Sequence, residues 1–421
     1  MKIKKTLKLF PAALLTVCML FLSACGGGTP KETDTQTGEE APVPAASKAY
    51  DGLFGDIMDI SVTVPTADLN VMLKNADDET YYQATVFVNG IKCSTAGIKT
   101  RGNTTYVSEA DSIRYSFKLK FGKYQKGVTI NGLDELYLNN MAYDPSYVRE
   151  YLAYLAFASL DAAAPLAAFA KVTVNGEYYG LYLAVEGTDD SFLKRAFGDN
   201  EGSLYKAKKG AALTEYDASA FSLKNGDDNG LKKISALINA LSSGEGIGDV
   251  LDVSSVLKYA AVISVLGCED SYLGPKAENY YLYDADGELT IVPWDLKLSF
   301  GTDGSMRKTN YTIKTSLLTA SVLEPYFDVL ATDRPLVSKL LENEEYLNEY
   351  KGYLKEVCDF LSKCETDYLP ALKAKLTEAV ESDTKKFYDT DAFASEFEDG
   401  ENSLLGFIKA RRENVLSRIG E

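Results

Sequence analysis

Polar and apolar residues alternate through much of the first half of the chain, which is typical of half-buried β-strands. In residues 114–121, Ser116, Lys118 and Lys120 share one face of the predicted strand, and apolar residues occupy the other. Asn-Gly pairs at residues 89–90 and 175–176 predict tight hairpin turns. The strands predicted in this way cover residues 60–64, 81–90, 91–102, 114–121 and most of 170–186.

Helical periodicity dominates the second half. The first half contains helices at 66–76 and 146–160, and the second half is predicted to be helical at 189–196, 229–242, 254–268, 335–378 and 391–420. One hairpin interrupts these helices, because apolar runs at 279–283 and 289–294 flank an Asp-Gly turn. The layout is α+β, with a strand-rich half followed by a helix-rich half and a boundary near Glu186.

Three oxygen-bearing side chains surround this hairpin. Asp270 follows the apolar helix predicted at 254–268, Asn279 begins the hairpin, and Asp295 ends it. Folding the hairpin returns Asp295 toward the other two. Hard oxygen ligands from neighbouring loops suit Mg²⁺ and the phosphates that accompany it.

The charge and composition exclude several classes of function. The 421 residues carry a net charge of −17, which disfavours DNA or RNA as a partner and makes a cationic protein partner easier to accommodate. The chain contains no histidine, which excludes Ser-His-Asp and Cys-His hydrolases and nearly all catalytic zinc sites. A general base must therefore be a carboxylate, Lys, Tyr or Cys.

The N-terminus predicts export and lipid attachment. Residues 1–24 combine a lysine-rich start with an apolar run, and the run closes on Leu-Ser-Ala before Cys25, as in a bacterial lipoprotein signal. We expect Cys25 to carry the lipid, residues 25–49 to be a flexible tether, and the protein to lie outside the cytoplasm, anchored to the cell membrane. An ordinary secretory peptide and a transmembrane anchor are the alternatives. The remaining cysteines have no spacing that favours a disulfide and are expected to be buried free thiols: Cys93, Cys268, Cys358 and Cys364.

Several segments, in a joint order from about residue 56 to 301, resemble the CotH family of spore-coat-type atypical protein kinases. They are IKTRGNTTY (98–106), SFKLKF (116–121), LYLNNMAYDPSYVREYLAYLAF (136–157), VTVNGEYYGLYLAVEGTDDSFLKR (172–195), GSLYKA (202–207) and NYYLY with VPWDLKLSFG (279–301). The resemblance implies a two-lobed kinase-like fold, with an N-lobe at 50–186 and a C-lobe at 187–421. It also implies binding of ATP with Mg²⁺ or Mn²⁺ and phosphorylation of protein serines.

The resemblance assigns phosphate-binding roles in the strand-rich half. Arg101 opens a polar turn whose amides face an anion. Lys118, with Lys120 as the neighbouring choice, reaches the α and β phosphates, and Glu150 pairs with that lysine. The alternatives are a solvent turn, an exposed strand edge and a surface pair of helix charges. Glu186, where the chain passes between lobes, contacts adenine through its backbone or caps the next helix.

The same comparison assigns the other residues. Lys206 faces the cleft or lies on the surface, Asp270 is the general base, and Asn279 and Asp295 hold the metal. For both acids the alternative is termination of a helix or strand. One departure is Lys297, which stands where family members commonly have a second acid.

Two main hypotheses follow. The first is an extracytoplasmic kinase acting on a protein substrate, which is cationic or Ser-rich. The second is a lipid-anchored surface binding module on an inactive, pseudokinase form of the fold. A solute-binding lipoprotein is a third possibility, but it predicts doubly wound α/β lobes, which the Asn-Gly hairpins oppose.

Overall fold

The structure is a computed structural model that describes residues 45–102, 114–304 and 311–420. The described residues all belong to one compact unit. The predicted signal segment, Cys25 and most of the predicted tether lie outside the described residues. Within the described residues, every helix is too short or too polar to cross a bilayer.

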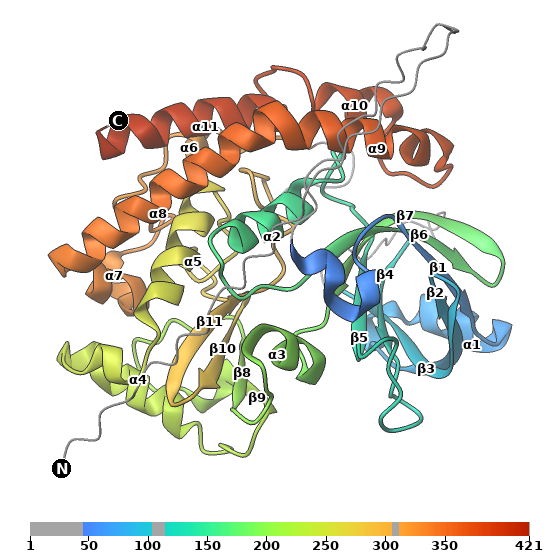
Figure 1. Cartoon of the computed structure of the whole chain (residues 1–421), viewed down its shortest axis with the longest axis horizontal. Helices are drawn as coiled ribbons and strands as arrows, with labels where there is room; N and C mark the ends of the chain where they lie inside the picture. Colours follow the sequence, from blue (N-terminus) through green and yellow to red (C-terminus); the bar gives the residue numbers. More distant parts are fainter. Residues whose placement is uncertain (1–44, 103–113, 305–310, 421) are drawn as a thin grey trace, which may run out of the picture. The chain divides into compact units, whose positions relative to one another are not determined.

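Seven strands of the first half close into a barrel in the order β1-β2-β3-β4-β5-β7-β6 (Figure 1). Neighbouring strands are antiparallel except at the closure, where β1 pairs in parallel with β6. The strands are β1 (Met58–Thr63), β2 (Tyr82–Val88), β3 (Ile91–Arg101), β4 (Ser116–Lys120), β5 (Glu135–Asn139), β6 (Ala167–Val174) and β7 (Glu177–Glu186).

The alternating pattern explains these strands. In β4, Phe117 and Leu119 are completely buried in the barrel core, and Lys118 points the other way. The β2–β3 turn uses Asn89 and Gly90, both at positive φ, as a tight hairpin turn requires. The pattern did not predict β5, which is only five residues long, nor the closure, which joins strands more than 100 residues apart.

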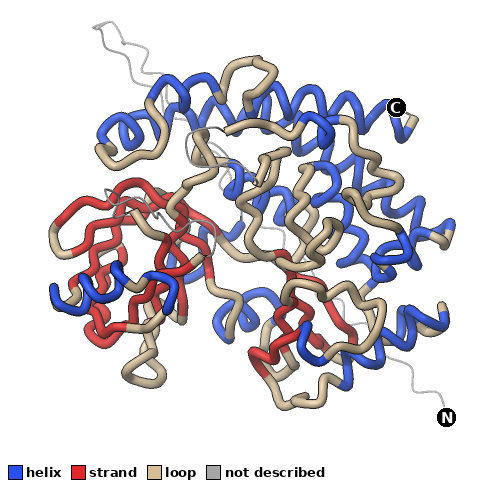
Figure 2. The backbone as a smooth tube through the Cα atoms, turned by 180° about the vertical axis from the view of Figure 1, so that it is seen from behind, coloured by secondary structure: helices blue, strands red, loops and turns tan. Residues whose placement is uncertain are grey.

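A second, smaller sheet contains four antiparallel strands in the order β11-β10-β8-β9. These strands are β8 (Leu204–Ala207), β9 (Phe221–Asn225), β10 (Tyr280–Ala285) and β11 (Glu288–Pro293). The predicted hairpin is confirmed as β10–β11, with its turn at Asp286 and Gly287. Strands β8 and β9 were not predicted. Figure 2 shows the two groups of strands as separate, with many of the helices gathered around the smaller sheet.

Helix α5 is central to the second region. It is buried on nearly all sides and packs against α8 and β11, so it holds the loop that follows it. The helices are α1 (Thr66–Lys74), α2 (Arg149–Ser159), α3 (Asp190–Phe197), α4 (Lys232–Ser243), α5 (Val253–Val265), α6 (Thr315–Leu318), α7 (Pro335–Leu341), α8 (Glu344–Lys363), α9 (Leu369–Ser382), α10 (Thr390–Ser395) and α11 (Leu404–Ile419). Short 3₁₀ or π turns occur at Ala45–Gly52, Ala76–Asp78, Ala218–Ala220, Ile247–Asp249, Ala331–Asp333 and Cys364–Tyr368.

The helix predicted over 335–378 is three helices in the structure. Helix α7 ends at Leu341, and Asn343 caps α8, because its side-chain oxygen accepts hydrogen bonds from the amides of Glu345 and Tyr346. A π turn then precedes Pro370 in α9. The α+β class is confirmed, and the four cysteines after residue 44 are buried and form no disulfide among the described residues, as expected.

Candidate functional site

A cavity of about 990 Å³ lies between the barrel and the second region. Its walls come from β3, β4 and β5 on one side and from β8, β9 and the β10–β11 hairpin with its flanking loops on the other. Eight residues proposed from the sequence line it: Arg101, Lys118, Lys120, Glu150, Lys206, Asp270, Asn279 and Asp295. The fold therefore brings together side chains that are up to 194 positions apart in the chain, between Arg101 and Asp295.

The barrel wall carries an ion-pair cluster centred on Glu135 of β5. Lys118 and Lys120, on the same face of β4, each place Nζ 2.5 Å from one carboxylate oxygen of Glu135. Burial favours the protonated form of Glu135, but the two lysines outweigh it and hold its pKa below the usual value. The predicted pairing of Lys118 with Glu150 is therefore wrong, because the lysine's partner comes from the neighbouring strand.

Glu150 lies instead beside Asp295. Its Oε2 accepts a hydrogen bond from Nδ2 of Asn139 at 2.8 Å, and its Oε1 is buried without a partner in the described part of the protein. Burial, followed by the charge of Asp295, raises the pKa of Glu150 to about 7. The preceding residue, Arg149, is buried and paired with Asp144 and Glu396, which fixes the start of α2.

The opposite wall holds the three residues that surround the hairpin. Nδ2 of Asn279 donates to the carbonyl oxygen of Asp270 at 2.8 Å, and the Trp294 amide donates to the carbonyl of Asn279 at 3.1 Å. Asn279 and Asp295 both have positive φ, 63° and 54°, a conformation uncommon for residues other than glycine. Such backbone strain is concentrated at functional sites. The hairpin thus returns Asp295 to the cavity that Asp270 and Asn279 line.

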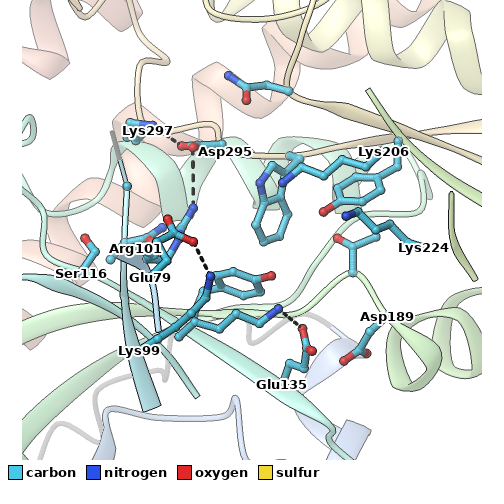
Figure 3. Close-up of a pocket in the computed structure, with 18 of the residues that line it drawn as sticks. Glu79, Lys99, Arg101, Ser116, Glu135, Asp189, Lys206, Lys224, Asp295 and Lys297 are labelled. Carbon is cyan, nitrogen blue, oxygen red and sulfur yellow. Dashed lines mark hydrogen bonds and ion pairs between the residues drawn. The ribbon is translucent and has the colours of Figure 1, made fainter. Parts of the chain in front are cut away.

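A lysine contacts each of these acids. Lys276 Nζ lies 2.7 Å from Asp270 Oδ1, and Lys297 Nζ lies 2.6 Å from Asp295 Oδ1. Arg101 reaches the other oxygen of Asp295 at 3.8 Å (Figure 3). Burial opposes ionisation of Asp295, but Lys297 and Arg101 lower its pKa below the usual value. Both contacts favour an ionised Asp295.

Lys206 has a different environment. It forms no ion pair among the described residues, and its Nζ lies 5.7 Å from the ring centres of Tyr281 and Trp294. Burial, then repulsion by Arg101 and other cations, lowers its pKa to about 8. An anion entering the cavity would give this ammonium a partner.

The donor set fits a divalent cation with a polyanion. Among the cavity-lining residues that are buried or partly buried, nine are acids and six are basic. Asp270, Asn279 and Asp295 supply hard oxygens, and Glu150 Oε1 is free to accept. In the part of the chain described, no group of three Asp, Glu, Cys or His side chains is already arranged around a single metal position.

Glu186 does not line the cavity. Its buried carboxylate accepts from Arg195 Nη2 at 2.6 Å, from the Tyr50 hydroxyl at 2.5 Å and from the Leu166 amide at 2.9 Å. The helix that follows is capped by Asp189 rather than by Glu186. The side chain of Glu186 therefore stabilises the end of β7. Only the first two residues of the polar turn that begins at Arg101 are described.

Two residues that the sequence did not single out are prominent here. Glu135 pairs with both lysines of β4. The alternation of polar and apolar residues over 135–139 was the signal in the sequence that could have indicated the strand carrying Glu135. Asp189 caps α3 through Oδ1, and its Oδ2 is buried without a partner among the described residues. Burial, then repulsion by Glu135, raises the pKa of Asp189 to about 8. A helix-capping aspartate has the same local sequence pattern whether or not it lines a cavity, so the sequence did not reveal the second role of Asp189.

Comparison with known proteins identifies the family of this chain. A family model described as CotH kinase protein matches residues 98–415, from β3 to α11, which is more than half of the chain. The chain belongs to the CotH family. This CotH protein is 25% identical over 315 residues to the inner spore coat protein H of Bacillus subtilis (strain 168). The match covers 69% of this chain and 80% of that relative, and it supports the resemblance drawn from the sequence.

Proposed function

We propose that this CotH protein transfers the γ-phosphate of ATP to serine or threonine hydroxyls of a protein, using Mg²⁺ or Mn²⁺. One observation carries the proposal: the Lys118–Glu135 ion pair and the Asp270, Asn279 and Asp295 group line one cavity from opposite walls. Membership of a family described as kinase supports it. In this proposal, residues 50–186 act as the N-lobe and 187–421 as the C-lobe of a kinase-like domain.

Each residue has a distinct role. Lys118, oriented by Glu135, binds the α and β phosphates, and Arg101 and Lys206 provide further positive charge. Lys120 acts with Lys118 on Glu135. Asp295 and Asn279 would hold the divalent cation, which neutralises phosphate charge when bound.

Asp270 acts on the acceptor. It takes the proton of the hydroxyl as the oxygen forms a bond to the γ-phosphorus and the bond to the β-phosphate oxygen breaks, which releases ADP. Lys276 contacts Oδ1 of Asp270, so the acceptor hydroxyl meets Oδ2 or displaces this lysine.

The proposed location follows from the N-terminus. Residues 1–24 would direct export, Cys25 would carry the lipid, and residues 25–49 would tether the folded part to the outer side of the membrane. By its name, the relative is also a protein of a surface structure, the spore coat.

The direct test is transfer of labelled phosphate from ATP by the purified full chain, with Mg²⁺ or Mn²⁺ and protein substrates. Asp270→Asn and Asp295→Asn should each lower the rate by at least about 100-fold. Asp286→Asn is the matched control, because Asp286 is exposed in the β10–β11 turn, and Asn tolerates its positive φ. Transfer that persists in both site variants would refute the mechanism.

A second function, binding without catalysis, is favoured by a specific observation. Both acids that would act in transfer contact lysines, and Lys297 stands where a second acid is common in the family. In that case the anchored domain would be a surface binding module on a pseudokinase fold. Melting curves with ATP and Mn²⁺ separate the two, because a ligand that binds the folded state raises the melting temperature. A shift that Asp295→Asn abolishes supports the kinase, and the absence of any shift supports the binding module.

A further inference from the structure

Charge at the cavity changes sign with depth. The exposed charged residues that line it are five lysines and one acid, Asp190. The deeper ones are mostly acidic, and the whole chain has a net charge of −17. The opening therefore has the opposite sign to the protein as a whole. We name its basic residues the mouth lysines: Lys126, Lys208, Lys209, Lys224 and Lys276.

Most mouth lysines form no direct ion pair in the part of the chain that the structure describes. Within the described residues, only Lys276 forms ion pairs, with Asp270 and Glu278. Lys208 donates to the carbonyl oxygen of Ser219 at 2.8 Å, and its charge is felt by the carboxylate of Asp217 without a direct ion pair between the two. Partial burial and the nearby charges of Lys118 and Lys208 lower the pKa of Lys224, as expected for cations held close together.

The mouth lysines lie next to the proposed general base. The Gly210 amide donates to the carbonyl oxygen of Lys276 at 2.7 Å, so the turn that carries Lys208 and Lys209 contacts the loop after Asp270. Lys276 in turn contacts Asp270 directly. Figure 3 shows Lys206 and Lys224 on the side of the cavity opposite Lys99 and Arg101. A segment that presents a hydroxyl to Asp270 would therefore lie close to Lys276 and to the turn that carries Lys208 and Lys209.

We propose that the mouth lysines select an acidic protein segment, in which Asp or Glu residues flank the acceptor hydroxyl. This inference rests on the proposed function only for the position of the hydroxyl at Asp270. The net charge by itself favours a cationic partner. At physiological ionic strength, however, charges more than about 8 Å away are largely screened, so the local lysines determine which segment docks.

The test measures binding without nucleotide. Three fluorescently labelled peptides of equal length each carry one serine, which is flanked by Glu and Asp in the first, by Gln in the second and by Lys in the third. Binding is measured as the rise in fluorescence anisotropy when the full chain is added to each peptide. We expect the acidic peptide to bind most tightly and its affinity to fall as salt is raised. The variant Lys208→Glu/Lys209→Glu/Lys224→Glu should weaken that binding about tenfold or more.

The control variant is Lys74→Glu/Lys171→Glu/Lys363→Glu, which changes the net charge equally at exposed lysines outside the cavity. It should change the affinity by less than about twofold. Equal or tighter binding of the neutral or basic peptide would overturn the inference, and so would equal losses of affinity in the two variants.

The transfer assay separates the two proposals. If the acidic peptide binds at the mouth but no peptide is phosphorylated, the kinase proposal fails and the docking surface remains. If the basic peptide is the preferred acceptor, the docking proposal fails and the kinase remains.

Discussion

Replacing Asp383 should destabilise the junction between the barrel and the C-terminal helices. The carboxylate of Asp383, at the end of α9, accepts from Arg114 Nη1 at 2.5 Å, and both side chains have zero exposure. The same carboxylate also accepts hydrogen bonds from the backbone amide of Leu181 in β7 at 3.0 Å and from that of Lys385 at 2.9 Å. Arg114, directly before β4, further donates to the backbone carbonyls of Asn140 and Leu181. These contacts join two strands that form the barrel to the helical region.

The size of the effect follows from burial. Removing one partner of a buried ion pair leaves an uncompensated charge and costs about 3–5 kcal/mol. Asp383→Asn keeps the shape and one acceptor oxygen, so we expect about 3 kcal/mol. With a urea dependence of about 3 kcal/mol/M, the unfolding midpoint should fall by roughly 1 M.

The assay is urea unfolding followed by the fluorescence of Trp294, the single tryptophan, which lines the cavity. Arg114→Met should cost a similar amount, and the double variant should cost clearly less than the sum of the two, because neither buried partner is then left alone. Glu342→Gln, in the exposed Lys339 pair, is the control and should cost less than about 1 kcal/mol. A midpoint for Asp383→Asn equal to that of the wild type, or strict additivity, would refute the reasoning.

Three further predictions concern the site and the anchor. The pKa of Asp189 is raised to about 8, so the folded state keeps a proton that the unfolded state releases near pH 4. The free energy of unfolding should therefore fall as the pH rises from about 4 to 8. Urea midpoints measured across that range should fall less in Asp189→Asn, which retains the helix cap, and an unchanged slope would contradict the assignment. Lys297→Asp removes the lysine from Asp295 and adds a second carboxylate, so Mn²⁺ should bind about tenfold more tightly by calorimetric titration, and unaltered affinity would argue against a metal at Asp295. Cys25→Ser should abolish incorporation of labelled fatty acid and release the protein from membranes, and a variant that stays lipid-labelled would disprove the anchor.

Local patterns predicted much of the secondary structure. Asn89-Gly90 and Asp286-Gly287 adopt the positive φ angles of tight turns because few other residue pairs can do so at low cost. The apolar sequence of α5 predicted its burial, and the order of Asp270, Asn279 and Asp295 around one hairpin predicted that they would lie close together. All of these depend on residues within about 30 positions of one another.

The errors concern contacts between distant elements. Glu150 was expected to pair with Lys118 because it lies in the next helix, but the actual partner, Glu135, is on the adjacent strand β5. Both glutamates are compatible with the sequence, since either could reach a lysine. Which of them does so depends on the direction in which α2 leaves the barrel.

By itself, the sequence determined the α+β class, the hairpins, the buried helix before Asp270 and the chemical character of the site residues, because periodicity and turn chemistry act over short stretches of chain. Only the tertiary structure decided the closure of the barrel through β1 and β6, the partner of Lys118 and the basic opening of the cavity. These features depend on which distant surfaces meet. A chain with a net charge of −17 can therefore have a basic opening, because composition adds charges over the whole molecule while screening makes a site respond to those nearby.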